Sequence, residues 1–178
     1  MAAREAGPVT ELATARAVFV GRFQPLHRGH HRVITTVREQ ADTLVIALGS
    51  PAAARTPENP LSAEEREATL GDCYPDLPVV RVADEGRGRA GERAWGRRLC
   101  RRTDADVVVS GNERVQRIVR DHTDAAVHEP ELHAPDTFSG TAIRRRIRAG
   151  EPWRDRVPEC CRERVADLAS IIARTGED

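Results

Sequence analysis

Residues 17–30 read AVFVGRFQPLHRGH, and this stretch decides the fold that we predict. The apolar run at 17–20 is typical of a buried strand, and Gly21 ends it without a side chain. A turn over residues 22–28, stiffened by Pro25, leads into a predicted helix over 30–40. Such a strand–turn–helix unit is the building block of a sheet that is covered by helices.

The same alternation continues to the end of the chain. Ser62 followed by Glu65 is the signature of a capping box, and Gly and Arg in residues 83–91 favour an irregular segment. The pattern predicts one α/β domain, a doubly wound parallel sheet with helices at its C-terminal end. Besides the first unit, it predicts strands at 43–48, 78–82, 106–109 and 125–128, and helices at 63–71, 92–102, 113–120, 139–149 and from 157 onward.

Composition narrows the function classes. The 178 residues suit a single domain, over 16–178, and residues 1–15 are expected to be a flexible extension. The formal net charge is zero, which argues against a nucleic-acid partner. All 28 basic residues are Arg, so chemistry that needs a Lys is excluded and phosphate would be held by guanidinium groups. No apolar run approaches the length that crosses a membrane.

The four cysteines form no CxxC pair. Adjacent Cys160 and Cys161 do not make a metal knuckle, and Cys73 and Cys100 stand alone. We therefore expect buried, reduced thiols in a cytoplasmic protein and no protein-bound metal.

Two histidines three residues apart follow the first strand. If a helix begins near Arg28, His27 and His30 project from its first turn on one side. The free N–H groups of that turn already favour an anion, and two imidazole donors would strengthen the site for a phosphate. Gly29 would let the phosphate approach the backbone. The alternatives are a pair of surface histidines, or a metal site for which no third ligand is evident.

A second anion-binding helix start is predicted late in the chain, in FSGTAIRRR at 138–146. Ser139 is a candidate N-cap, and Ser139, Gly140 and Thr141 place hydroxyl and N–H groups at the helix end. Arg144 shares a face with Thr141, whereas Arg145 and Arg146 are rotated away and are interpreted as a solvated basic face. Two such helix starts suit a triphosphate.

GRFQPLHRGH at 21–30 and SGTAIR at 139–144 resemble the signatures of the archaeal-type nicotinamide-nucleotide adenylyltransferases, in the HxGH nucleotidyltransferase superfamily. The resemblance implies a Rossmann-like fold and adenylyl transfer from ATP, with Mg²⁺, to nicotinamide mononucleotide, forming NAD and pyrophosphate. It implies that His27, His30 and Arg144 are catalytic. The ATP-binding residues implied are Gly21, Arg22, Phe23, Gln24, His27, His30, Ser139, Gly140, Thr141 and Arg144.

Weaker matches concern the acceptor. ENPLSAEER at 58–66 is similar to a family stretch, and the resemblance implies that the mononucleotide contacts Asp84, Trp95, Ser110 and Asn112. Trp95 stands where relatives stack a Trp on the pyridine ring, with a core Trp as the alternative. Glu92 replaces an expected Asn and residues 85–91 are an insertion, so the choice between nicotinamide and nicotinic acid mononucleotide stays open.

Other functions remain as alternatives. A transferase of the same superfamily could act on another phosphorylated acceptor such as FMN, and a nucleotide-sensing regulator would bind without turnover. A nucleic-acid binder rests only on the Arg runs at 97–102 and 144–148. The family resemblance also implies a homo-oligomer, such as a hexamer.

Overall fold

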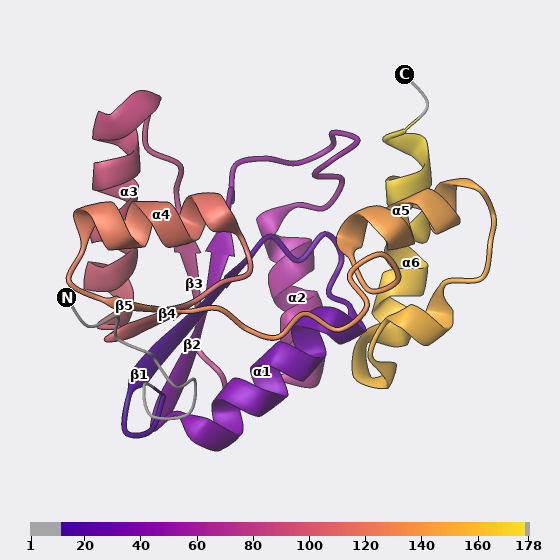
Figure 1. Ribbon diagram of the computed structural model, residues 1–178. Coiled ribbons are helices and arrows are strands. Elements are labelled where there is room, and N and C mark those ends of the chain that lie inside the picture. Colours follow the sequence, from indigo (N-terminus) through magenta and orange to yellow (C-terminus); the bar gives the residue numbers. More distant parts are fainter. Residues whose placement is uncertain (1–11, 177–178) are drawn as a thin grey trace.

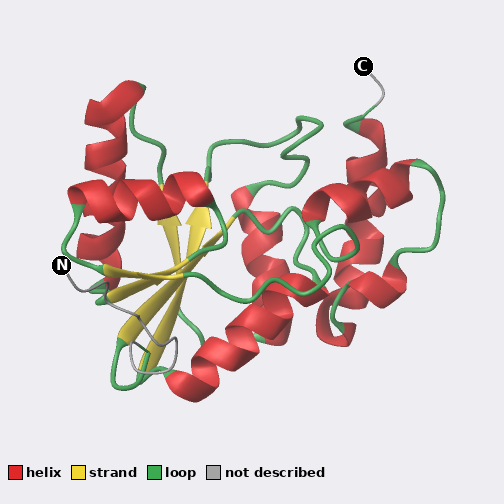
Figure 2. Ribbon diagram, in the orientation of Figure 1, coloured by secondary structure: helices red, strands yellow, loops and turns green. Residues whose placement is uncertain are grey.

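A five-stranded parallel sheet forms the centre of the molecule. The computed structural model describes residues 12–176, and its strand order is β3-β2-β1-β4-β5 (Figures 1 and 2). Every pair of neighbouring strands is parallel, so all carboxyl ends lie at one edge. The strands are β1 (Arg16–Gly21), β2 (Thr43–Gly49), β3 (Val79–Val82), β4 (Val107–Val109) and β5 (Ala126–His128).

Helices cover both faces of the sheet, as predicted. Helices α3 and α4 lie on one face and α1 and α2 on the other, and α5 and α6 pack beside α2 (Figure 1). The helices are α1 (Arg28–Gln40), α2 (Ala63–Cys73), α3 (Gly88–Thr103), α4 (Glu113–His122), α5 (Gly140–Arg148) and α6 (Arg162–Arg174), with two 3₁₀ turns, η1 (Arg154–Arg156) and η2 (Glu159–Cys161).

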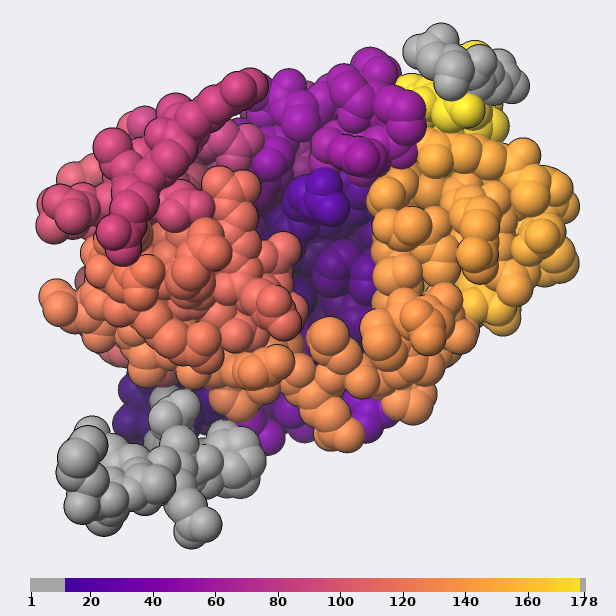
Figure 3. Space-filling view, turned by 45° about the horizontal axis from the view of Figure 1, so that its top comes forward, coloured from indigo at the N-terminus to yellow at the C-terminus, as the bar shows by residue number. Residues whose placement is uncertain are grey.

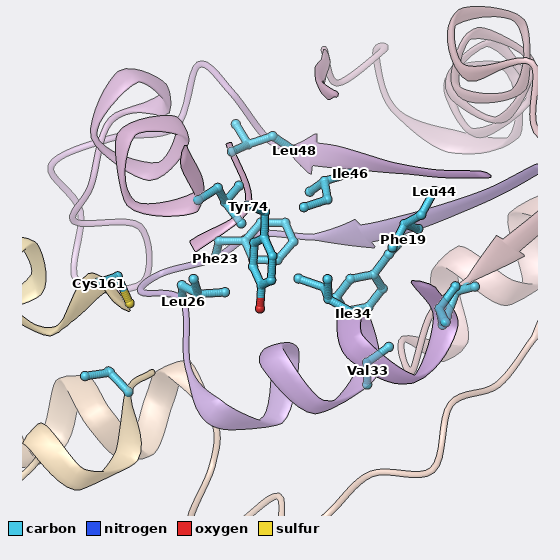
Figure 4. Close-up of a cluster of buried hydrophobic side chains, with 14 of the residues drawn as sticks. Phe19, Phe23, Leu26, Val33, Ile34, Leu44, Ile46, Leu48, Tyr74 and Cys161 are labelled. Atoms are coloured by element: carbon cyan, nitrogen blue, oxygen red, sulfur yellow. The ribbon is translucent and has the colours of Figure 1, made fainter. Parts of the chain in front are cut away.

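Each sheet face carries its own hydrophobic core because side chains alternate along a strand. Phe19 and Ile46 point to the larger core, where they meet α1 and Tyr74 (Figure 4). Val18 and Ala47, their neighbours in sequence, point to the smaller core under α3 and α4. The doubly wound arrangement follows directly from strands that are apolar on both faces.

Two predicted helix boundaries are wrong. Helix α3 begins at Gly88, inside the segment expected to be irregular, because Gly91 lets the chain fold back onto the helix. A Cβ at Gly91 would lie 1.9 Å from the carbonyl oxygen of Glu85. The last helix begins at Arg162 rather than near 157, because the two 3₁₀ turns precede it.

The expectation of four reduced thiols is also wrong. Cys73 at the end of α2 and Cys160 in η2 form a disulfide between residues 87 positions apart. Sequence spacing could not reveal this pairing, because it depends on the packing of η2 against α2. Cys161 is a buried free thiol, and Cys100 is free and half-buried.

The predicted extension over residues 1–15 falls mostly outside the described residues. Within its last part, Leu12 and Ala15 are buried in the larger core. The backbone N–H of Ala15 donates to the carbonyl of Leu12, which makes a turn ahead of β1. Among the described residues, no helix is both long and apolar enough to span a membrane.

Candidate active site

A cavity of about 970 Å³ lies at the carboxyl ends of the strands, where α/β sheets bind ligands. Figure 3 shows it as a hollow whose floor belongs to the start of the chain. We name its two sides by their residues. The histidine wall comprises His27, Gly29, His30 and Ser139, and the tryptophan wall comprises the lining residues of 84–95 and 110–118.

The histidine wall begins with the N-terminus of α1. His27 is the N-cap, and its Nδ1 accepts a hydrogen bond from the backbone N–H of His30 at 3.2 Å. This bond leaves the ring proton of His27 on Nε2. The rings of His27 and His30 stack with centroids 3.6 Å apart, which confirms that both project from the first turn on one side.

The surroundings of both imidazoles favour their neutral form. Burial and the charge of Arg144 lower the pKa of His27 to about 4. Burial and the proximity of His27 lower the pKa of His30 well below its usual value, and among the described residues the buried Nδ1 of His30 has no hydrogen-bond partner. The two rings therefore offer neutral N–H donors at neutral pH, and a bound polyanion would favour their protonation.

The second predicted helix start lies against the first. Arg144 Nη1 donates to the carbonyl of Gln24 at 2.8 Å, across 120 residues of sequence. Its Nη2 donates to Thr141 Oγ1 at 3.2 Å, which confirms that these two residues share a face. Gly140 permits this junction, since a Cβ there would lie 2.9 Å from both Arg144 Nη1 and the Gln24 oxygen. Ser139 caps α5 by accepting from the N–H of Ala142.

Arg144 carries a buried positive charge without an ion pair. The residue is only 6% exposed, and among residues 12–176 it forms no ion pair and its Nε has no hydrogen-bond partner. Burial and the charges of Arg148 and Arg22 lower its pKa to about 10, so it remains a cation at neutral pH. A buried, unpaired cation beside two imidazole donors is a site for an anion.

The residues at the end of β1 have distinct places. Gly21 and the exposed Arg22 line the cavity, and Arg22 reaches Asn59 Oδ1 at 3.5 Å. Phe23 is buried, and its ring fills the space beside Gly21 where a Cβ would lie. Gln24 is also buried, and its side-chain amide pairs with both backbone groups of Leu61. The side chains of Phe23 and Gln24 thus shape the turn from behind the cavity.

Gly29 serves the packing of the protein itself as well as the cavity. A Cβ at this position would lie 2.8 Å from the carbonyl oxygen of Phe138 and 2.9 Å from Nδ1 of His27. Gly29 therefore allows the chain ahead of α5 to approach the first turn of α1. This close approach brings the two helix starts to one wall.

Sequence reasoning gave no role to Arg66, although it ends the stretch at 58–66. Arg66 is fully buried, and it donates to the carbonyls of Arg22, Gly49, Ser50 and Ser62 at 2.9–3.1 Å. It therefore positions the ends of β1 and β2 under the cavity. In the sequence, Arg66 stood out only because it follows the capping box of Ser62 and Glu65. That position did not predict that its side chain would be buried.

The tryptophan wall holds the four residues expected to contact the acceptor. Trp95 both packs in the smaller core and lines the cavity, which joins the two interpretations of this residue. Asp84 is exposed at the cavity. Ser110 is buried, and its Oγ accepts from the N–H of Asn112, whose Oδ1 caps α4.

Arg145 is exposed, and Arg146 pairs with Glu151, away from the cavity.

Comparisons with known proteins find a family model and relatives that match most of the chain. The family model described as cytidylyltransferase-like matches residues 18–146, which include both helix starts. A nicotinamide-nucleotide adenylyltransferase of Methanosarcina acetivorans is 37% identical over 157 residues, with 88% of this chain and 90% of that protein covered. The chain belongs to the family of nicotinamide-nucleotide adenylyltransferases. A relative of the same name from Archaeoglobus fulgidus is 31% identical, with 88% and 93% covered.

A solved structure shows the same fold at lower identity. It is a bifunctional NMN adenylyltransferase/ADP ribose pyrophosphatase from Francisella tularensis, complexed with AMP and a manganese ion. The TM-score is 0.69 at 16% identity, with 89% of this chain covered. The chain spans about half the length of that protein, 51%.

Proposed function

We propose that this protein transfers the adenylyl group of ATP to nicotinamide mononucleotide, forming NAD and pyrophosphate. The observation that carries the proposal is the buried, unpaired Arg144 beside the stacked imidazoles of His27 and His30. One side of the cavity thus offers two N–H donors and two helix N-termini, and the Arg144 cation lies directly behind them. These groups together suit a polyphosphate.

The proposed reaction needs placement more than proton transfer. The 5′-phosphate of the mononucleotide attacks the α-phosphorus of ATP, a new P–O bond forms, and the bond to the pyrophosphate oxygen breaks. Because the second pKa of a phosphate monoester is about 6, the nucleophile is already ionised and needs no strong base. In-line placement and charge stabilisation supply the acceleration.

The residues divide this work. His27 and His30 contact the α- and β-phosphates as charge shifts to the leaving group, and Arg144 with Thr141 and Ser139 holds the β- and γ-phosphates. Arg22 reaches the phosphates from the cavity floor, while Gly21 makes room for the ring of Phe23 and Gly140 for the contact of Arg144 with Gln24. Phe23 and Gln24 act through the shape of their turn.

Magnesium fits this site as a companion of ATP. Within residues 12–176 there is no group of three or more His, Cys, Asp and Glu side chains that could hold a metal. The solved relative contains AMP and manganese, which supports a divalent ion in the reaction. Mg²⁺ would reduce the charge repulsion between the two phosphate groups.

The tryptophan wall is the proposed acceptor site. An indole face suits an electron-poor pyridinium ring, so Trp95 would stack on the base of the mononucleotide. Asp84, Ser110 and Asn112 would bind its ribose and phosphate. We place the reaction in the cytoplasm and expect a homo-oligomer such as a hexamer, which light scattering at micromolar concentration would test.

Product analysis tests the proposed function. Protein, ATP and Mg²⁺ are incubated with nicotinamide mononucleotide, nicotinic acid mononucleotide or FMN, and the products are identified by mass. The proposal expects a pyridine dinucleotide and pyrophosphate. A flavin dinucleotide would identify the transferase alternative, and ATP binding without any product would identify the sensor alternative.

A further inference from the structure

Glu92 lies on the tryptophan wall and has no role in the reaction described above. It precedes Trp95 by three residues on α3, so the two side chains share a helix face, and both line the cavity. The carboxylate is 16% exposed, which makes it accessible to a ligand but shielded from bulk water. It stands next to the ring that would carry the pyridine.

Two arginines of α4 hold this carboxylate. Arg114 Nε and Arg117 Nη2 contact Glu92 Oε1 at 3.2 and 3.1 Å. Both contacts use the same oxygen, so neither arginine occupies Oε2. This clamp of Glu92 by Arg114 and Arg117 fixes the direction of the carboxylate. Within residues 12–176, Oε2 has no hydrogen-bond donor and can accept one from a ligand.

The clamp also engages Arg114, a cation at this wall. Arg114 itself lines the cavity, and without Glu92 its guanidinium would be available to a carboxylate ligand. Arginine binds carboxylates in a planar, two-bond geometry, so a released Arg114 would attract an acidic acceptor. Glu92 thus occupies the group that would otherwise favour the nicotinic acid form.

We propose that Glu92, clamped by Arg114 and Arg117, selects the carboxamide form of the acceptor and rejects the carboxylate form. Oε2 accepts a hydrogen bond from the carboxamide N–H₂ group, and it repels the carboxylate of nicotinic acid mononucleotide. This inference rests on the proposed function. A site rejects a ligand strongly when the ligand leaves a buried charge unpaired or places a like charge beside it. A single residue can therefore decide between the carboxamide and the carboxylate form.

The test compares kcat/KM for the two mononucleotides in wild type and Glu92→Gln. The amide keeps the size of the side chain but removes its charge and frees Arg114 and Arg117. We expect the preference for the carboxamide form to fall at least tenfold, mainly through faster reaction of the acid form. Adding Arg114→Gln in the Glu92→Gln background should remove that gain.

Glu85→Gln is the matched control. Glu85 lines the same wall but pairs with Arg98, so its loss leaves the clamp of Glu92 in place. We expect the acceptor ratio to change less than twofold. An equal shift in Glu85→Gln, or no shift in a folded Glu92→Gln protein, would overturn the inference.

Calorimetric binding separates this inference from the proposed function. Each mononucleotide is titrated into wild type and Glu92→Gln without ATP, and tighter binding of the acid form by the variant supports the inference independently of turnover. A wild type that forms no dinucleotide from either acceptor contradicts the proposed function. A wild type that forms NAD while Glu92→Gln keeps both the kinetic and binding ratios contradicts only the role of Glu92.

Discussion

The two walls of the cavity are built by different means. The histidine wall joins two helix N-termini, and buried Arg144, which has no ion-pair partner among the described residues, packs behind it. On the tryptophan wall, Glu92 is held by two arginines and Glu85 by Arg98, while Asp84 stands exposed at the cavity. The histidine side thus offers a buried cation to a ligand, whereas Glu85 and Glu92 of the tryptophan wall already have arginine partners.

This difference teaches how affinity and selectivity are separated in one cleft. An unpaired buried cation attracts any polyphosphate strongly, but it distinguishes poorly between nucleotides. A wall whose groups already have partners attracts a ligand weakly, but it rejects the wrong acceptor because an added charge would compete with existing ion pairs. Changes on the histidine wall should therefore alter rate, and changes on the tryptophan wall should alter acceptor choice.

The largest effect is expected at the floor that both walls share. Arg66→Met removes four hydrogen bonds to the ends of β1 and β2 and leaves those carbonyls buried, which should cost about 5 kcal/mol of unfolding free energy. Urea denaturation measures the loss. Arg38→Met, which breaks an exposed pair with Asp76, is the control and should cost less than about 1 kcal/mol. Equal losses would show that Arg66 is not a structural anchor.

The disulfide should matter for the histidine wall alone. Cys73–Cys160 ties α2 to the segment before α6, which packs on α5. Cys160→Ser should lower the unfolding free energy by about 4 kcal/mol, since the bond closes a long loop. It should raise KM for ATP more than KM for the acceptor.

Cys100→Ser is the matched control for the disulfide, because Cys100 is free and belongs to the opposite side of the sheet. We expect it to change the unfolding free energy by less than about 1 kcal/mol. If reduction of the wild type left its denaturation midpoint unchanged, the disulfide would not stabilise this half of the molecule.

His30→Ala should lower kcat at least a hundredfold, a loss of about 2.7 kcal/mol of transition-state stabilisation. His30 lines the cavity, while the adjacent His31 turns its ring to Tyr74. This contact leaves His31 half-buried and outside the cavity lining. His31→Ala is therefore the matched control, with kcat expected within threefold of wild type, and similar rates for both variants would remove His30 from the mechanism.

The two helix starts of the histidine wall were readable from sequence because the features of each are local. Strand ends, helix caps and the spacing of His27 and His30 depend on residues within a few positions of one another. The same holds for the capping box of Ser62 and Glu65, which forms as predicted. Where a motif coincides with a local preference such as a helix cap, the sequence predicted both the element and the place of its residues.

The remaining features depend on contacts between distant segments. The clamp of Glu92 joins α3 to α4, Arg66 reaches back to β1 and β2, and Cys73 meets Cys160 where η2 packs against α2. The early start of α3 likewise depends on Gly91 meeting residue 85. Neither hydrophobic periodicity nor residue spacing indicates such long-range contacts, so the sequence did not predict them.

The central claim is that one polyphosphate lies between the two helix starts, in contact with the imidazoles. NMR titration of His27 measures this directly, with and without saturating Mg²⁺–ATP, and His122, outside the cavity lining, serves as an internal reference. Since a nearby polyanion favours the imidazolium form, the account predicts that the pKa of His27 rises from about 4 by at least one unit when ATP binds. A pKa of His27 that stays unchanged when ATP is bound would contradict it.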